Sequence, residues 1–282
     1  MAQAVLGDVT LNYVEAGAGP PVLLVHGVAC GWRMWRSQIR ALRPAFRVVA
    51  YDQRGHGQST APEDPAAYSQ IILADDLAGL IRRLSLAPVR IVGLSLGGAV
   101  ALELTIRHPE LVAALVLADT GSGSDDPAAA RRLCESWATA TRAEGIGRFA
   151  SLMIASPFFD TYAAQGGRRA RCHLELLVRQ HTAHGLANVV TQVVARRPPV
   201  YDRAAELARF TQPTLVLCGE RDRVCIRPSE FLAATIPGAE LVFLPKLGHM
   251  TNLEAPCQFN ATMLDFLAAS APCRAAPSVR PQ

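Results

Sequence analysis

The stretch Val89-Arg90-Ile91-Val92-Gly93-Leu94-Ser95-Leu96-Gly97-Gly98 decides the fold, because an apolar run passes through a glycine-rich turn into a segment with helical spacing. This is the strand, turn and helix setting in which a G-x-S-x-G motif carries a nucleophilic serine. A turn this tight forces Ser95 into strained backbone geometry, and a side chain at Gly93 or Gly97 would collide with the neighbouring turn. The Ser95 hydroxyl is therefore predicted to stand clear of a sheet, at the first turn of a helix.

A serine hydroxyl is a weak nucleophile until an imidazole takes its proton, so the motif predicts a histidine later in the chain. His249 is the candidate, because it lies in a loop between the last predicted strand and the last predicted helix. Two aspartates at strand ends, Asp119 and Asp222, compete as the carboxylate that orients this imidazole. The chain order serine, aspartate, histidine fits both of them.

An acyl-transfer site also needs backbone N–H groups that bind the developing oxyanion. Leu96 N–H points from the first turn of the predicted helix into the space beside Ser95. The loop His26-Gly27-Val28-Ala29-Cys30-Gly31 follows another predicted strand, and Val28 N–H is the candidate for the second donor. The charged and glycine-rich loop 52–59 is predicted to have a structural role only.

Apolar runs alternate with helix-period segments along most of the chain, which predicts an α/β fold with a mostly parallel sheet flanked by helices. The predicted strands are 11–15, 22–25, 46–51, 89–92, 111–118, 213–218 and 241–244, and their runs of Val, Leu and Ile without alternation indicate burial on both faces. The predicted helices are 34–42, 71–84, 96–107, 228–235 and 256–268.

Residues 122–209 interrupt this alternation, because helical spacing continues there without a convincing strand and is broken by Gly145, Gly166-Gly167 and Pro198-Pro199. We predict an inserted helical cap over 122–209, a core formed by 1–121 and 210–269, and a disordered tail over 270–282. Residues 131–209 hold twelve arginines and six acidic residues, a net charge of +6 against +4 for the whole chain. The positive charge therefore belongs to the cap. It is interpreted as solvated surface, or alternatively as Arg196 or Arg197 binding a substrate carboxylate.

Composition excludes several classes of protein. With 282 residues, 50% of them hydrophobic, the chain is neither disordered nor fibrous, and a charge of +4 is too thinly spread for nucleic acid. We find no apolar run of about 20 residues and no signal-peptide pattern, so we expect a cytoplasmic protein without membrane contact.

The seven cysteines are scattered without CxxC pairing, which indicates neither a disulfide framework nor a zinc site. We find no phosphate-binding glycine loop, and the cap histidines 173, 181 and 184 have no acidic co-ligand, so no cofactor and no metal are expected.

Taken together, residues 11–269 resemble the α/β-hydrolases. The motifs that carry the resemblance occur in family order: His26-Gly27, Asp52-x-Arg54-Gly55-x-Gly57-x-Ser59, Gly93-x-Ser95-x-Gly97-Gly98, Pro213-Thr214-Leu215-Val216 with Gly219-x-x-Asp222, and Gly248-His249 with Glu254. The resemblance implies an α/β-hydrolase fold with a triad of Ser95, Asp222 and His249, and oxyanion donors at Val28 and Leu96. It thus favours Asp222 over Asp119.

Within that superfamily, residues 52–59 and 248–256 are most similar to 3-oxoadipate enol-lactonases and bacterial esterases. This resemblance implies cofactor-free hydrolysis of a small-molecule ester or lactone. Epoxide hydrolases and haloalkane dehalogenases carry an aspartate where this chain has Ser95, and carbon-carbon bond hydrolases often carry a tryptophan where it has Met250. A carbon-carbon bond hydrolase, a cofactor-free perhydrolase and a non-catalytic small-molecule receptor stay as alternatives. The sequence leaves the natural substrate and the oligomeric state open.

Overall fold

The computed structural model describes residues 1–270. The disorder predicted for the tail concerns residues that, apart from Ser270, lie outside this range. Ser270 itself follows the last helix, where its hydroxyl donates to Phe266 O. No helix within 1–270 has both the length and the apolar character needed to cross a membrane.

The described residues form one eight-stranded sheet in the order β1-β2-β4-β3-β5-β6-β7-β8. Its strands are β1 (Ala2–Leu6), β2 (Val9–Ala16), β3 (Pro21–Val25), β4 (Arg47–Tyr51), β5 (Val89–Leu94), β6 (Val112–Ala118), β7 (Thr214–Gly219) and β8 (Glu240–Leu244). Strands β3 to β8 are parallel, and only the β1–β2 and β2–β4 pairs are antiparallel. The predicted mostly parallel sheet is confirmed.

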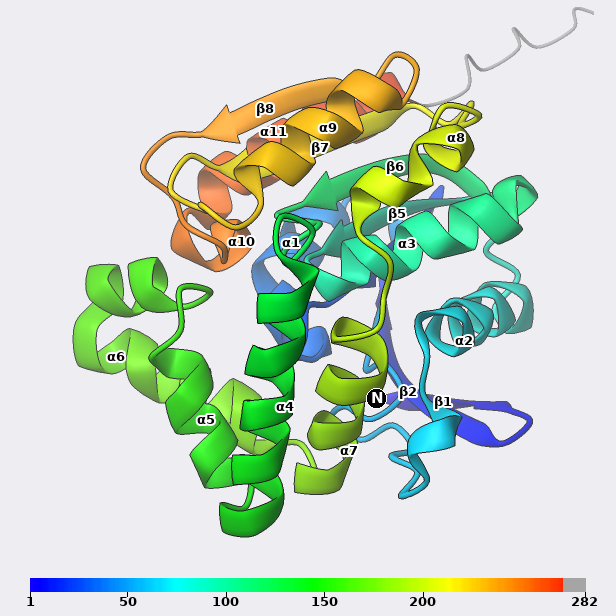
Figure 1. Ribbon diagram of the computed structural model, residues 1–282. Helices are drawn as coiled ribbons and strands as arrows, with labels where there is room; N and C mark the ends of the chain where they lie inside the picture. Colours follow the sequence, from blue (N-terminus) through cyan, green and yellow to red (C-terminus); the bar gives the residue numbers. More distant parts are fainter. Residues whose placement is uncertain (271–282) are drawn as a thin grey trace, which may run out of the picture.

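Helices cover both faces of the sheet (Figure 1). The helices of the core are α1 (Arg36–Leu42), α2 (Gln70–Arg83), α3 (Leu96–Arg107), α9 (Ile226–Thr235), α10 (Thr251–Glu254) and α11 (Pro256–Ala269), with short 3-10 turns η1 (Trp32–Trp35), η2 (Pro65–Ala67) and η3 (Pro109–Leu111). Apolar side chains of α2, α3 and α9 pack on one face. Those of α1 and α11 pack on the other. The continuous Val, Leu and Ile runs of the central strands are buried because both faces are covered.

Three details differ from the sequence-based expectations. Strand β1 was not predicted, and its exposed alternate residues are typical of an edge strand. Strand β8 is the opposite edge and is only partly buried, with Phe243 38% exposed, so burial on both faces was wrong for it. The helix predicted from residue 34 starts instead as the 3-10 turn η1, and α1 follows it.

Between β6 and β7 the chain, fully described there, forms helices and no strand. We call residues 122–209 the cap. Its helices are α4 (Pro127–Glu144), α5 (Ile146–Ile154), α6 (Asp160–Arg179), α7 (Ala183–Asn188), the π-helix η4 (Val189–Val194), η5 (Val200–Arg203) and α8 (Ala204–Leu207). Gly145, at φ 84°, separates α4 from α5, and Gly167, at φ 53°, kinks α6. Helices α4 to α7 lie together at one end of the molecule, shown in green in Figure 1.

Candidate active site

Ser95 sits at the sharp turn between β5 and α3, with φ 55° and ψ −114°. This strained conformation is held by Ser95 N–H, which donates to Ala118 O at 2.8 Å. The turn needs its glycines, because a Cβ at Gly93 would lie 2.6 Å from Gly97 O and a Cβ at Gly97 would collide with Val25 O. The predicted strand, turn and helix around Ser95 are therefore present.

The structure brings Ser95, His249 and Asp222 into one hydrogen-bonded line. His249 Nε2 lies 3.0 Å from Ser95 Oγ, and His249 Nδ1 lies 2.7 Å from Asp222 Oδ2. All three side chains are buried, with Ser95 6% exposed. In this arrangement Nδ1 donates to Asp222, which leaves Nε2 free to accept the serine proton.

Two further residues fix the imidazole in place. Glu254 accepts hydrogen bonds from Gly248 N–H at 2.6 Å and from Met250 N–H at 3.1 Å, which holds the loop on either side of His249. Phe158, from the cap segment between α5 and α6, packs its ring edge-on against His249 at 4.8 Å between centroids. No pattern in the sequence indicates this role for Phe158, because its position depends on how the cap folds over the core.

Asp119, the other candidate carboxylate, lies elsewhere in the same buried region. Its Oδ1 accepts from Gly219 N–H at 2.8 Å, and its Oδ2 accepts from the Thr251 hydroxyl at 2.5 Å. Gly219 ends the strand before Asp222, and Thr251 begins the helix after His249, so Asp119 links the two segments that carry Asp222 and His249. Burial raises the pKa of Asp119 well above its usual value, and the nearby charge of Asp222 raises it further.

We expect Asp119→Ala to destabilise the protein and Asp119→Asn to be well tolerated. Alanine leaves Gly219 N–H and the Thr251 hydroxyl buried without their partner, at a cost of about 1 to 3 kcal/mol for each group. Asparagine keeps the Oδ1 acceptor for Gly219 N–H, and its amide can donate to the Thr251 oxygen in place of the hydrogen bond that the Thr251 hydroxyl donates to Asp119. Urea unfolding of both variants measures the difference, and equal loss of stability would contradict this role for Asp119.

The loop 26–31 lies against Ser95, as its predicted role in oxyanion binding requires. A Cβ placed at Gly27 would lie 3.4 Å from the Ser95 Cβ. No acceptor for Val28 N–H occurs among residues 1–270, whereas the next amide, Ala29 N–H, donates to His56 Nε2 at 3.3 Å. Leu96 N–H belongs to the first turn of α3, where amides have no partner within the helix. The oxyanion roles of Val28 and Leu96 stay a prediction.

One group of side chains at the triad has the composition of a metal site. Ligand atoms of Asp222, Cys225 and His249 lie within 4.8 Å of one another. A cation there would need His249 Nδ1, which already bonds to Asp222, and a Cys225 thiolate, although burial raises the pKa of this thiol well above its usual value. Cys225 Sγ instead donates to Asp119 O at 3.2 Å. The donor set therefore suits a triad better than a metal ion.

The cap histidines have separate partners. His173 Nδ1 contacts the Tyr162 hydroxyl at 2.9 Å, His181 Nδ1 accepts from Gly57 N–H at 2.6 Å, and His184 Nε2 contacts Ala61 O at 2.9 Å. Their spacing in the sequence therefore does not correspond to one ligand cluster.

We expect chelators such as ethylenediaminetetraacetate to leave the hydrolytic rate unchanged. The reason is that His249 Nδ1 is already bonded to Asp222 Oδ2 and Cys225 Sγ donates to Asp119 O, so two of the three side chains are engaged elsewhere than on a metal. The measurement is the rate before and after dialysis against chelator. Inhibition that added zinc reverses would instead assign a metal to Asp222, Cys225 and His249.

The loop 52–59 has the structural role predicted for it. Asp52 accepts from the Asn12 side chain at 2.8 Å and from Trp32 N–H at 2.9 Å. Arg54 is buried and pairs with Asp76 at 2.7 Å and Asp8 at 2.9 Å. These contacts fasten the loop to the neighbouring segments.

A cluster of three buried histidines joins this loop, the loop 26–31 and the cap. His26 and His56 lie 4.8 Å apart between ring centroids, and His56 and His181 lie 5.2 Å apart. Each ring accepts a backbone N–H on its unprotonated nitrogen: His26 from Gln53, His56 from Ala29 and His181 from Gly57. Burial lowers the pKa of His26 and of His181 to about 3, and that of His56 well below its usual value.

We expect the free energy of unfolding to fall as the pH drops below 6.5, the ordinary pKa of histidine. Below this pH the histidines of the unfolded chain bind protons, whereas the buried histidines of the folded cluster stay neutral. Each such histidine therefore lowers the free energy of unfolding by about 1.4 kcal/mol per pH unit. His181→Gln can still accept from Gly57 N–H and should therefore make this slope shallower. Urea unfolding at several pH values between 7 and 4 measures how steeply the free energy of unfolding falls with pH. The substitution His184→Gln, at a half-buried position, is the control. An unchanged slope in His181→Gln would contradict the role assigned to the cluster.

Neither arginine proposed from the sequence as a substrate ligand contacts the triad. Arg197 Nη2 donates to Ser122 O at 2.5 Å and to Ser122 Oγ at 3.0 Å, which links the end of the cap to its beginning. Arg196 is exposed and lines a cavity whose walls include no triad residue. Arg168, Arg169 and Arg171 are exposed on α6, as expected of solvated surface charge.

The family model, the relatives and the solved structures that match this chain agree on its fold. The family model described as alpha/beta hydrolase fold matches residues 20–256. The protein named "Putative carbamate hydrolase RutD" of Agrobacterium fabrum is 32% identical over 255 residues, which are 88% of this chain and 93% of that protein. The solved structures with a TM-score of 0.83 include a thermophilic esterase from Thermogutta terrifontis, which is 30% identical with 95% of this chain and 97% of that chain covered. They also include the enol-lactonase from Burkholderia xenovorans, which is 26% identical with 95% of this chain and 100% of that chain covered.

Proposed function

Because the chain belongs to the alpha/beta hydrolase family, we propose that it is a serine hydrolase that cleaves a carboxylic ester or lactone through an acyl-enzyme. The observation that carries the proposal is the line of contacts from Ser95 Oγ through both nitrogens of His249 to Asp222. A receptor that binds without turnover does not need this arrangement. Ser95 is the nucleophile, His249 the base and then the acid, and Asp222 the orienting carboxylate.

The reaction follows from this geometry. Ser95 Oγ attacks the carbonyl carbon while its proton passes to His249 Nε2, and the negative carbonyl oxygen accepts from Val28 N–H and Leu96 N–H. The carbon to leaving-group bond then breaks, and His249 returns the proton to the departing oxygen. Water repeats the sequence on the acyl-enzyme: His249 accepts its proton, the acid is released and Ser95 is restored.

The relatives support this class of substrate. Esters, lactones and carbamates all present a carbonyl carbon bonded to oxygen, and three of the similar proteins are named as an esterase, an enol-lactonase and a carbamate hydrolase. Met250, which follows the catalytic histidine, favours these substrates over carbon-carbon bond cleavage because hydrolases of that kind often carry a tryptophan there.

The test is a substrate panel with wild-type protein and Ser95→Ala side by side. It contains nitrophenyl acetate and butyrate, an enol-lactone, a nitrophenyl carbamate and a vinylogous 1,5-diketone for carbon-carbon cleavage, and one arm supplies acetate with hydrogen peroxide. We expect steady turnover of esters or lactones by the wild type only. A single burst that stalls would favour a receptor, and activity confined to the diketone or to peracid formation would replace the proposal with one of those reactions.

A further inference from the structure

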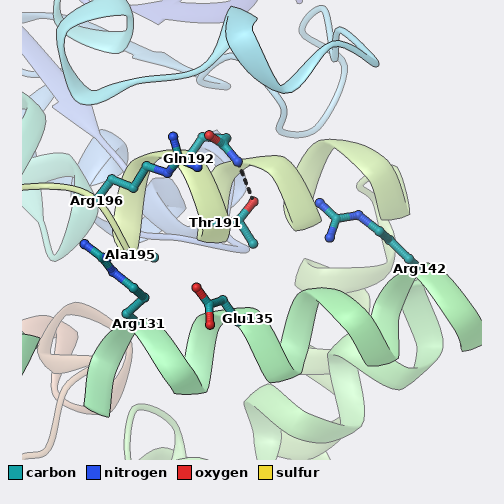
Figure 2. A pocket seen from close by; sticks show the side chains of 7 residues that line it. All are labelled: Arg131, Glu135, Arg142, Thr191, Gln192, Ala195 and Arg196. Carbon is teal, nitrogen blue, oxygen red and sulfur yellow. Dashed lines mark hydrogen bonds between the residues drawn. The ribbon is translucent and has the colours of Figure 1, made fainter. Parts of the chain in front are cut away.

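A cavity of about 560 Å³ opens on the cap between α4 and η4, and its walls include none of Ser95, His249 and Asp222. Figure 2 shows Arg131, Glu135 and Arg142 on α4, with Thr191 directed toward them from η4 and Gln192 and Arg196 beside it. Its volume lies within the range of about 300 to 1,000 Å³ that is typical of small-molecule sites. Nothing in the proposed reaction uses this cavity.

The arginines face the cavity because of their spacing on α4. Residues 131, 135 and 142 recur at steps of four and seven, which places them on one stripe of the helix. The neighbouring stripe, Cys134, Trp137, Ala138 and Thr141, is buried and fixes the rotation of α4. The polar stripe is consequently turned to η4, whose C-terminal end presents Arg196.

The three guanidinium groups of the cavity have no acidic partner among residues 1–270. Elsewhere in the cap, Arg148 pairs with Glu144 at 3.5 Å and Arg179 with Glu175 at 2.8 Å. At the cavity, Arg142 donates only to Asn188 Oδ1 at 3.3 Å, and Glu135 forms no ion pair with any of the three. Three arginines and one glutamate leave a charge of +2 on the walls.

The charges are placed unevenly along the cavity. Figure 2 shows Arg131 and Arg196 toward one end, Arg142 at the other end and Glu135 between them. Because α4 rises about 1.5 Å per residue, the backbones of Arg131 and Arg142 are about 16 Å apart along the helix. The cavity thus offers a cationic group at each end and a carboxylate in the middle.

We propose that this cavity binds an extended small molecule with an acidic group at each end and an uncharged middle. A guanidinium fork binds carboxylate and phosphate alike, so linear dicarboxylates and terminal bisphosphates share the required chemistry. Glu135 disfavours a third negative charge at the centre and can accept from a hydroxyl there. The Gln192 amide, which contacts Thr191 Oγ1 at 3.4 Å, supplies a further donor on the opposite wall.

Titration calorimetry of the wild-type protein tests the proposal with suberate, fructose 1,6-bisphosphate and the one-ended control octanoate. We expect one of the two-ended ligands to bind about tenfold or more tightly than octanoate, because each hydrogen-bonded charge pair contributes about a factor of ten. Preference for suberate assigns carboxylate ends to the ligand, and preference for the bisphosphate assigns phosphate ends. Absence of binding, or equal binding of octanoate and suberate with no bisphosphate binding, would overturn the proposal.

Variants locate the binding. The double variant Arg131→Gln with Arg142→Gln should bind the two-ended ligand more than about tenfold more weakly than the wild type does. Arg168→Gln with Arg169→Gln removes the same charge from exposed positions of α6 outside the cavity and should leave the affinity unchanged. An equal loss of affinity in both double variants would mean that general charge attraction accounts for the binding. This result would overturn the proposed site. Ester hydrolysis by Arg131→Gln with Arg142→Gln should match the wild type, so failure here is distinguishable from failure of the proposed hydrolase activity.

Discussion

Replacing Ser95 by alanine is expected to reduce ester hydrolysis by up to about a million-fold, as in other enzymes whose nucleophile and base act as one unit. The alanine keeps the turn between β5 and α3 and the Ser95 to Ala118 backbone hydrogen bond, so the fold should persist. It removes the atom that lies 3.0 Å from His249 Nε2. Steady-state rates with a nitrophenyl ester, corrected for the spontaneous rate, give the size of the loss.

Ser229→Ala is the matched control. Ser229 is fully buried on α9, and its hydroxyl has no hydrogen-bond partner among the described residues, so its removal should leave the rate nearly unchanged. His249→Ala should lose about as much activity as Ser95→Ala, because the base and the nucleophile depend on each other. A folded Ser95→Ala protein with wild-type activity would refute the mechanism.

The second large effect is expected for Asp222→Asn, with a loss on the order of ten-thousand-fold in kcat. The amide has almost the shape of the carboxylate, but it stabilises the imidazole in the tautomer whose Nε2 carries the proton. Such an imidazole cannot accept the proton of Ser95. The 2.7 Å contact between Asp222 Oδ2 and His249 Nδ1 is the bond that the substitution alters.

Asp119→Asn is the internal control for that experiment, because it changes a neighbouring buried carboxylate that does not contact His249. Its rate should stay within a small factor of the wild type. If Asp119→Asn were the more damaging of the two substitutions, Asp119 rather than Asp222 would be the carboxylate that orients His249.

Most of the core could be predicted from the sequence, because its signals are local. The apolar run before Gly93 and the helical spacing after Gly97 specify the turn at Ser95 without knowledge of the rest of the chain. Strand β1 lacked such a signal, since Ala2, Gln3 and Ala4 are weakly patterned and the strand depends on pairing with β2. The exposure of β8 also depends on its position at the edge of the sheet, which a single segment does not encode.

The sequence predicts only those site residues that chain order or a position at the end of a strand can identify. Both Asp119 and Asp222 follow parallel strands and point to the same edge of the sheet, so residue chemistry alone left them equivalent. Packing separates them, because Asp119 is engaged by Gly219 and Thr251 while Asp222 faces His249. Phe158 and Arg197 act through contacts between distant segments of the cap, the loops and the core, which helical periodicity within the cap does not determine.

Labelling with a fluorophosphonate, followed by mass spectrometry of the digested protein, tests the nucleophilic role of Ser95 most directly. This reagent phosphonylates a serine whose proton a neighbouring base removes, and the adduct resembles the tetrahedral intermediate that the oxyanion donors bind. We predict one adduct per chain, on the peptide that contains Ser95, with activity lost in proportion to labelling. Full hydrolytic activity in protein quantitatively labelled at Ser95, or inactivation with the adduct on another residue, would contradict the assignment.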